Sequence, residues 1–245
     1  MENMQDKINQ FLSENKINIK GGTITSERQL SAVLSDLALG DLKKGKIDKA
    51  MYFVEKSLEF NDKNYYSYFV KGLINRNANK VKEAVEAFET YVSNTGTDDS
   101  LAHIYMGLSY AELSDVENAL KHLRKGEKGL SNEEKEMHLP LIGVTYECIG
   151  NIYLNRENIV EFTERDKYSL NYKTAARYYK MSLKIHRKNC DLINKLAACY
   201  CHLEDLNKAL YCYEQASKIA EDNTMYLEAI EQMKAEGAKP EQAGF

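Results

Sequence analysis

The chain has 245 residues, of which 43% are hydrophobic and 29% are charged, and its formal net charge is −4. This composition is that of a folded globular protein and excludes a disordered or collagen-like chain. The slight negative charge leaves no electrostatic footprint for nucleic acid or for an anionic membrane. Only two prolines and 13 glycines occur, which indicates a helical protein, because all-β folds need frequent turn signals.

The composition and the first residues also predict the compartment. The N-terminal residues lack the apolar stretch of a secretory signal, and no window approaches the roughly 18 apolar residues of a membrane-spanning helix. The five cysteines are an odd number, which favours reduced thiols over a disulfide framework. We therefore expect a cytoplasmic protein with no segment inserted in a membrane.

Residues 1–30 precede the first regular pattern. Ile8, Phe11 and Leu12 recur at the spacing of one helical face, and Gly21-Gly22 with the threonines and serine that follow predict a loop. This helix and loop would either cap the structure that follows or cover its inner surface. The sequence leaves both alternatives open.

A pattern of about 34 residues then recurs five times over residues 31–223. The second half of each repeat carries Ala50, Ala84, Ala119, Ala175 or Ala209, followed four residues later by Val54, Phe88, Leu123, Tyr179 or Tyr213. The first half carries a small residue: Ala38, Gly72, Gly107, Gly150 or Ala197. Each repeat is predicted to be two antiparallel helices, in which the small residues allow close packing.

The pattern resembles the tetratricopeptide repeat (TPR). Counting from the first residue of each repeat, the small residue stands at position 8, a tyrosine often at 11, the alanine at 20 and the larger residue at 24. Departures from the family exist: Asp41 and Asn75 replace the tyrosine, and the tryptophan of position 4 and the terminal proline are absent. The resemblance implies an all-α fold, a right-handed superhelical α-solenoid of antiparallel helix pairs. Its five repeats are 31–64, 65–98, 100–133, 143–189 and 190–223.

Two segments interrupt the repeats. Residues 134–142 follow a capping box that begins at Ser131, and Pro140 suits the first turn of the next helix, so they predict a longer loop or one extra turn. The fourth repeat holds an insertion near 157–169. This insertion is either an extension of both helices or a binding loop.

The C-terminal residues complete the predicted array. Residues 224–236 have apolar side chains at helical spacing and predict a capping helix, which repeat arrays need at their ends. Residues 237–245 follow Gly237 and are predicted to be a flexible tail.

No pattern points to a catalytic site, a cofactor or a metal. The sequence lacks phosphate-binding glycine loops, the zinc-protease motif and the nucleophile elbow. The densest group of metal-binding residue types is Cys199, Cys201 and His202, with His186 and Cys190 nearby. Residues two apart on a helix point about 200° away from each other, so we expect Cys199 and Cys201 to be free thiols.

In the family that the pattern resembles, positions 2, 5, 9, 12 and 13 of the first helices line the concave groove. Here they are mostly apolar in repeats one to three and carry amides or acids in repeats four and five. We select as the peptide-binding groove Tyr66, Phe69, Leu73, Arg76, Leu101, Ile104, Leu108, Asn151, Asn155 and Asn194. The apolar members would hold apolar anchors. The asparagines would hydrogen-bond a peptide backbone, although they are equally consistent with ordinary solvated surface.

These features predict a non-enzymatic protein–protein interaction module. It would be an adaptor or co-chaperone that binds an apolar helical or extended segment of another protein. The cationic clamp with which some TPR proteins grip a C-terminal carboxylate is absent, so acidic heat-shock-protein tails are not expected ligands. The alternative is a scaffold that self-associates through exposed repeat ends. Motifs and charge do not support an enzyme or a nucleic-acid-binding protein.

Overall fold

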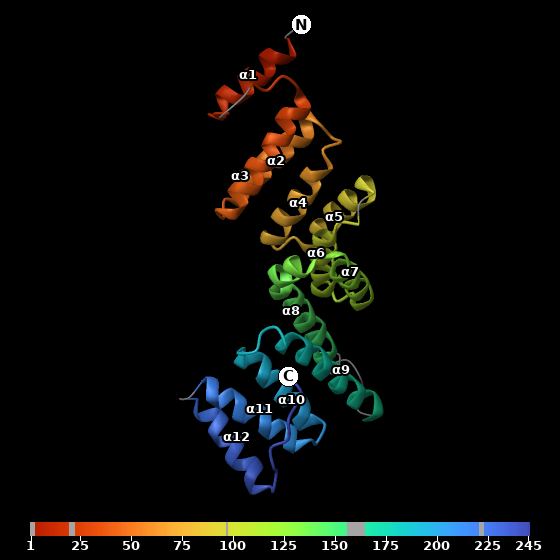
Figure 1. Ribbon diagram of the computed structural model, residues 1–245, viewed down its shortest axis with the longest axis vertical. Helices are drawn as coiled ribbons and strands as arrows, with labels where there is room; N and C mark the ends of the chain where they lie inside the picture. The colour runs from red at the N-terminus through yellow and green to blue at the C-terminus, as the bar shows by residue number, and fades with distance from the viewer. Residues whose placement is uncertain (1–2, 20–22, 97, 156–164, 221–222) are drawn as a thin grey trace. The chain divides into compact units, whose positions relative to one another are not determined.

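The computed structural model describes residues 3–19, 23–96, 98–155, 165–220 and 223–245. These residues form twelve helices and no strand (Figure 1). They divide into two compact units, residues 1–102 and 103–245, each described by itself below. The fold is an all-α solenoid of antiparallel helix pairs, which confirms the fold class predicted from the repeat.

The first unit contains a single helix followed by two helix pairs. Its helices are α1 (Met4–Glu14), α2 (Glu27–Lys43), α3 (Ile47–Phe60), α4 (Tyr65–Asn77) and α5 (Val81–Thr95). α2 packs along α3, and α4 packs along α5 (Figure 1). The apolar faces of these helices enclose a core that includes Leu34, Phe53 and Val70.

The second unit contains three helix pairs and a final single helix. Its helices are α6 (Ser100–Glu112), whose first three residues end the first unit, α7 (Val116–Gly129), α8 (Asn132–Asn155), α9 (Arg165–Leu183), α10 (Cys190–His202), α11 (Leu206–Ile219) and α12 (Thr224–Ala235). α8 packs along α9, α10 packs along α11, and α12 covers α11. Tyr172, Leu196 and Leu210 lie in the core of the last two pairs.

The turn inside the helix pairs has the same backbone geometry in four repeats. The residue at position 15 has a positive φ: 71° at Gly45, 59° at Asn79, 63° at Ser114 and 58° at Glu204. In each turn the amide of position 16 donates to the carbonyl of position 11, at 2.8–2.9 Å. This bond ends the first helix and reverses the chain. This hydrogen bond joins two main-chain groups, so it forms whether the residue at position 11 is an aspartate, an asparagine or a tyrosine.

The glycines at position 8 make room for the side chain at position 24 of the same repeat. A β-carbon on Gly72 would lie 2.5 Å from the ring of Phe88, and one on Gly150 would lie 2.6 Å from a tyrosine ring. On Gly107 it would lie 3.0 Å from the backbone nitrogen of Leu123. The alanines at position 20 are all fully buried. Close packing at positions 8 and 20 is thus observed, and in addition the residue at position 24 rests directly on position 8.

A buried cluster of hydroxyl groups joins three helices of the first unit. The Ser35 oxygen of α2 lies 3.1 Å from that of Ser57 in α3 and 2.6 Å from that of Ser67 in α4. The side-chain amide of Asn64 donates to the hydroxyls of Ser31 and Ser35, each at 2.9 Å. All four serines are fully buried, so the protein itself must satisfy their hydrogen bonds. Ser35, at position 5 of the first repeat, therefore holds helices together.

The N-terminal segment packs against the second helix of the first repeat. The rings of Phe11 and Phe60 are 5.2 Å apart, and the Tyr52 hydroxyl donates to the side-chain oxygen of Asn15 at 3.0 Å. Phe60 and Tyr52 both belong to α3. Of the two alternatives that the sequence leaves open, these contacts favour the cap.

The residues after α12 differ from the flexible tail predicted from the sequence. Ala243 is only 2% exposed, and the centroid of the Phe245 ring lies 5.9 Å from that of Tyr211 in α11. The Lys239 amide donates to the side-chain oxygen of Asn207 at 2.9 Å. Glycine, proline and charged residues give this segment the local signature of a frayed end. Its contacts, however, are with residues such as Asn207, 32 positions earlier in the chain.

α8 begins earlier than the repeat pattern predicts. The capping box is present, because the Ser131 hydroxyl accepts from the Glu134 amide at 3.3 Å and a Glu134 oxygen accepts from the Ser131 amide at 2.9 Å. The helix then continues to Asn155, so Pro140 lies inside it, not in its first turn as predicted. Proline has no N–H to donate along the helix. The Pro140 carbonyl lies 3.2 Å from Nε2 of His186, just after α9.

The predicted insertion near 157–169 is described only in part. Residues 157–164 lie outside the described residues, so its two alternative interpretations stay predictions. Residues 165–169 are helical and belong to the first turns of α9.

Candidate peptide-binding surface

Position 2 of the first helices supplies accessible residues. Tyr66 of α4 is 39% exposed, and Val144 of α8 is 40% exposed. Ala32 and Asp191, at position 2 of the first and fifth repeats, are also exposed, and Leu101 in the third is half-buried. An apolar or aromatic residue at position 2 therefore meets solvent in repeats two and four.

Three of the predicted groove residues are buried inside their own unit. Phe69 is 7% exposed, and Ile104 and Leu108 are buried. The Phe69 ring packs against Phe88 at 5.8 Å and Tyr91 at 5.3 Å between centroids. Position 5 thus points into the helix packing in these repeats. The structure places these three side chains in the core, which corrects their selection as exposed groove residues.

The other predicted residues reach the surface. Tyr66 and Asn155 are exposed, and those that are half-buried are Leu73, Arg76, Leu101, Asn151 and Asn194. In the first unit, α4 carries Tyr66, Leu73 and Arg76, which we call the α4 surface. Burial and the nearby Asp36 raise the pKa of Tyr66, so its hydroxyl stays neutral and able to donate.

In the second unit, Lys195 joins α8 to α10. Its Nζ lies 2.8 Å from a Glu147 oxygen and 2.7 Å from an Asp191 oxygen. Burial acts to lower the pKa of Lys195, but its hydrogen bonds to Asp191 and Glu147 raise it overall. Lys195 stands at position 6 of its repeat. It is not among the predicted residues, because the groove positions carried over from the family are 2, 5, 9, 12 and 13. Only helix packing brings it to Glu147, 48 residues away.

The asparagine at position 9 of the fourth repeat has a fixed orientation. The Tyr179 hydroxyl donates to the side-chain oxygen of Asn151 at 2.9 Å. This bond orients the amide group so that its nitrogen points away from the Tyr179 hydroxyl. Asn151 lies one turn along α8 from Glu147, and Asn194 is adjacent to Lys195. Val144, Glu147, Asn151, Asn194 and Lys195 form what we call the α8–α10 surface.

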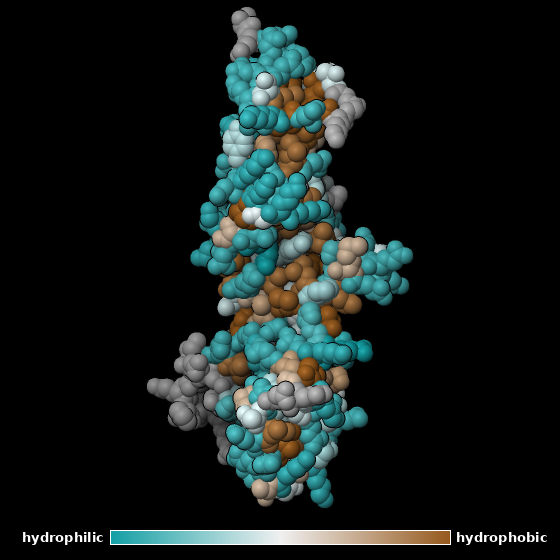
Figure 2. All heavy atoms as spheres, turned by 90° about the vertical axis from the view of Figure 1, so that its left-hand side faces the viewer, coloured by the Kyte–Doolittle hydropathy of each residue, from teal (hydrophilic) through white to brown (hydrophobic). Residues whose placement is uncertain are grey.

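The first turns of α8 add apolar side chains that the repeat numbering leaves out. Met137 is 74% exposed. Met137, Leu141 and Val144 are spaced by four and three residues and share one face of the helix. Figure 2 shows, in brown, apolar atoms that reach one face of the molecule between hydrophilic ones. A signal was available in the sequence, because the capping box at Ser131 places these residues on a helix.

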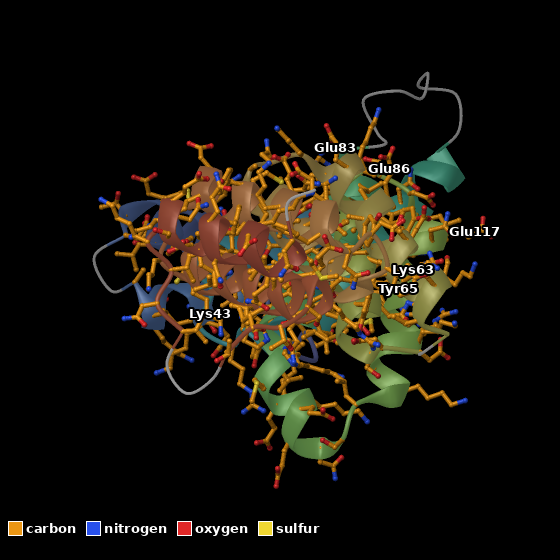
Figure 3. All side chains as sticks on the ribbon, turned by 90° about the horizontal axis from the view of Figure 1, so that it is seen from above. Lys43, Lys63, Tyr65, Glu83, Glu86 and Glu117 are labelled. Atoms are coloured by element: carbon orange, nitrogen blue, oxygen red, sulfur yellow. The ribbon has the colours of Figure 1, made fainter. Side chains whose placement is uncertain are left out.

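The second helices carry charge on their outer side. Glu83 and Glu86 of α5 are exposed and point away from the chain (Figure 3), and Glu117 of α7 is exposed as well. A helix with one polar face and one apolar face turns the polar face to solvent. Some second helices nevertheless expose large apolar residues as well, namely Tyr52, Leu170 and Ile219.

The grouping of metal-binding residue types and the state of Cys212 both bear on what chemistry the described side chains can do. Among residues 3–19, 23–96, 98–155, 169–220 and 223–245, no group of three or more His, Cys, Asp or Glu could hold a metal ion. Burial raises the pKa of Cys212 to about 12, so this thiol stays protonated and unreactive. In the part of the chain with described positions, no helix has the length and apolarity needed to cross a membrane.

Several solved structures are similar to this chain. YrrB, described as a TPR protein with an unusual peptide-binding site, matches with a TM-score of 0.57 and 18% identity over 93% of this chain and 99% of that chain. MamA matches with a TM-score of 0.58 and 15% identity over 81% of this chain and 96% of that chain. PilF of Pseudomonas aeruginosa matches with a TM-score of 0.56 and 15% identity over 86% of each chain.

Sequence comparison adds nothing to these similarities, because no protein-family model matches the chain and no curated protein sequence matches it. The likeness is therefore one of fold. It agrees with the spacing of small and large residues and with the recurrent turn at position 15. This chain has the fold of a tetratricopeptide-repeat protein, as its residue pattern predicts.

Proposed function

We propose that this chain is a non-enzymatic protein–protein interaction module, an adaptor or co-chaperone. It binds an apolar helical or extended segment of another protein on the first helices of its repeats. The observation that carries the proposal is the exposure of Tyr66 and Val144 at position 2 of the first helices. Exposed apolar side chains of this kind gain free energy when a partner buries them.

The two surfaces offer different contacts. On the α4 surface, Leu73 follows Tyr66 by seven residues and lies on the same helical face, so the two can hold apolar anchors of one segment. On the α8–α10 surface, Val144 stands beside amides that can bond a peptide backbone. Glu147 and Asp191 share the single positive charge of Lys195. The negative charge that remains favours a segment with a basic residue near its anchor.

A displayed library of 16-residue peptides, selected on the immobilised full chain, tests this proposal. Fluorescence anisotropy then measures the affinity of a selected peptide for variants. A buried aromatic anchor typically contributes about 2 kcal/mol, which is about a 30-fold change in Kd. We therefore expect Tyr66→Glu or Val144→Glu, on the surface that the peptide uses, to weaken binding by at least tenfold.

Glu86→Lys is the matched control, because it changes charge at an exposed residue on the outer side of α5. It should leave the affinity unchanged. Peptides that bind all three variants equally well would contradict the proposal. If no peptide is selected and the chain's mass rises with concentration in light scattering, the self-associating scaffold becomes the better interpretation.

A further inference from the structure

Position 22 of the second helices differs between the ends and the middle of the array. In the three middle repeats it is charged and exposed: Glu86, Lys121 and Arg177. In the first and fifth repeats it is Tyr52 and Tyr211. Each of these tyrosines contacts a terminal segment of the chain, Tyr52 through Asn15 and Tyr211 through Phe245. Where position 22 is aromatic, the second helix thus holds another segment.

The C-terminal segment is held through alternate main-chain groups. The amide of Lys239 donates to the side-chain oxygen of Asn207 at 2.9 Å, and the amide of Glu241 donates to the Asn207 carbonyl at 3.1 Å. The carbonyl of Ala243 accepts from the Tyr200 hydroxyl at 3.3 Å. A period of two residues is that of an extended chain. The helices therefore bind this segment as they would bind an extended peptide.

Alternate side chains of the segment are also recognised. Glu241 lies 3.6 Å from Nζ of Lys208, Ala243 is buried, and the Phe245 ring packs edge-on against Tyr211. A larger residue in place of Ala243 would meet the core around it. These contacts select an acidic residue, a small residue and an aromatic residue, each separated by one residue.

We propose that Tyr200, Asn207, Lys208 and Tyr211 form a second peptide-binding site, here called the strap site, which the chain's own residues 239–245 occupy. Its other ligand is an extended segment of a partner protein with the pattern acidic–x–small–x–aromatic. The strap site shares no residue with the α4 surface or the α8–α10 surface, although its Tyr200 belongs to the first helix α10. Lys208 and Tyr211 stand at positions 19 and 22, where the second repeat has Glu83 and Glu86 pointing outward (Figure 3).

Several of the contacts that hold residues 239–245 are open to solvent, so the segment can be displaced. The ion pair of Glu241 and Lys208 is largely exposed, and such pairs contribute little. Segments with few buried contacts open at low free-energy cost. Because Gly237 directly follows the last turn of α12, the tether keeps the segment at an effective concentration in the millimolar range or above. A free peptide must therefore compete with it.

The test uses the full chain and a fluorescein-labelled peptide Lys-Pro-Glu-Gln-Ala-Gly-Phe, the sequence of residues 239–245. Ala243→Asp in the protein places a charge at a buried position and should release the segment without changing the strap site. We expect this variant to bind the peptide at least tenfold more tightly than the wild type in fluorescence anisotropy. Phe245→Ala removes the ring that packs against Tyr211 and the neighbouring core, and should act in the same direction.

Further substitutions in the Ala243→Asp background locate the binding. Tyr211→Ala and Asn207→Ala should each weaken peptide binding at least tenfold, whereas Lys121→Ala, at position 22 of the third repeat, should not change it. A peptide with the Ala243→Asp change should not bind. Equal peptide affinity of the wild type, Ala243→Asp and Phe245→Ala would overturn the proposal, and so would binding that does not depend on Tyr211. Loss of helical circular dichroism in both releasing variants would also overturn it, because residues 239–245 would then be part of the folded core.

Discussion

At the scale of single residues, the absence of one methyl group sets the spacing of a helix pair. Gly72 of α4 faces the ring of Phe88, which is fully buried. The first repeat instead has the larger Ala38 at position 8 and the smaller Val54 at position 24. The sizes of the two positions are thus matched in these two repeats, whereas the fifth repeat combines Ala197 with Tyr213.

Gly72→Ala should destabilise the protein by about 1–3 kcal/mol, the usual cost of overpacking a core, because the Phe88 ring has no room to move. Combined with Phe88→Val, it should cost less than the sum of the two single changes by about 1 kcal/mol. Urea unfolding followed by circular dichroism measures both. Gly40→Ala is the control, since no atom lies within 4 Å of the added carbon, and alanine there should stabilise α2 by about 0.5–1 kcal/mol. If the losses of unfolding free energy in Gly72→Ala and Phe88→Val were strictly additive, positions 8 and 24 would not share this space.

A pair of histidines is another residue-scale feature, between α6 and α7. Nδ1 of His103 lies 2.9 Å from Nδ1 of His122, and Tyr110 stacks on the His122 ring at 5.4 Å. Burial and the neighbouring His103 lower the pKa of His122 to about 4. One ring must accept the hydrogen bond through an unprotonated nitrogen, and His122, with its lowered pKa, is neutral in the folded protein above about pH 4.

This pair predicts a loss of stability in mild acid. In the unfolded chain a histidine has a pKa of about 6.5, above the folded value, so the unfolded state binds more protons between these two pH values. The contribution of His122 is complete above about pH 6.5 and decreases as the pH falls toward 4. Because the ring is partly exposed, we expect a loss of roughly 1–2 kcal/mol.

Urea unfolding at pH 7.5 and at pH 5 measures this loss. His122→Gln should flatten the pH dependence, whereas His138→Gln, on α8 outside the pair, should leave it as in the wild type. A pH dependence that survives in His122→Gln would assign the effect to other groups.

At the scale of helices, one left-handed residue per pair fixes the turn. Gly45 adopts this conformation without a steric penalty, whereas Glu204 adopts it with a side chain. The left-handed conformation costs a residue with a β-carbon roughly 1–2 kcal/mol. Four repeats nevertheless keep this geometry, because it lets the position-16 amide close the end of the first helix.

Substitutions at position 15 in two of these turns should change the stability of the protein in opposite directions. Glu204→Gly should stabilise the protein by about 1 kcal/mol, and Gly45→Ala should destabilise it by a similar amount. No atom lies within 4 Å of a β-carbon at Gly45, so the cost there is conformational. Denaturant unfolding of the two variants measures both values. Changes of the same sign would indicate that φ at position 15 does not control the stability of the turn.

Helix boundaries show where local sequence signals succeed and fail. The capping box at Ser131 is present, yet Pro140, which favours the start of a helix, lies inside α8. The preceding turns of α8 override this local preference. The end of the chain shows the same limit, because its glycine and proline suggest a frayed tail, whereas distant Asn207 and Tyr211 hold it in place.

At the scale of the molecule, the first and second helices of the repeats differ in the residues that they expose. Within each unit, second helices carry charge on their outer side, as at Glu83 and Glu86 (Figure 3). First helices carry accessible apolar and amide groups such as Tyr66 and Asn151, and second helices also expose Leu170 and Ile219. A ligand on the strap site would contact α11 together with Tyr200 at the end of α10.

The helix pairs, the close contact of positions 8 and 20 and the α-solenoid class could all be predicted from the sequence. They depend on periodicity and on residue size at fixed spacing, which are local properties of the chain. The accessible surface could not be predicted in full. Position 5 is buried at Phe69 and Ile104, Lys195 reaches Glu147 from another helix, and residues 239–245 lie on α11. Burial, ion pairing and docking depend on neighbours that are distant in the chain, and only packing brings those neighbours together.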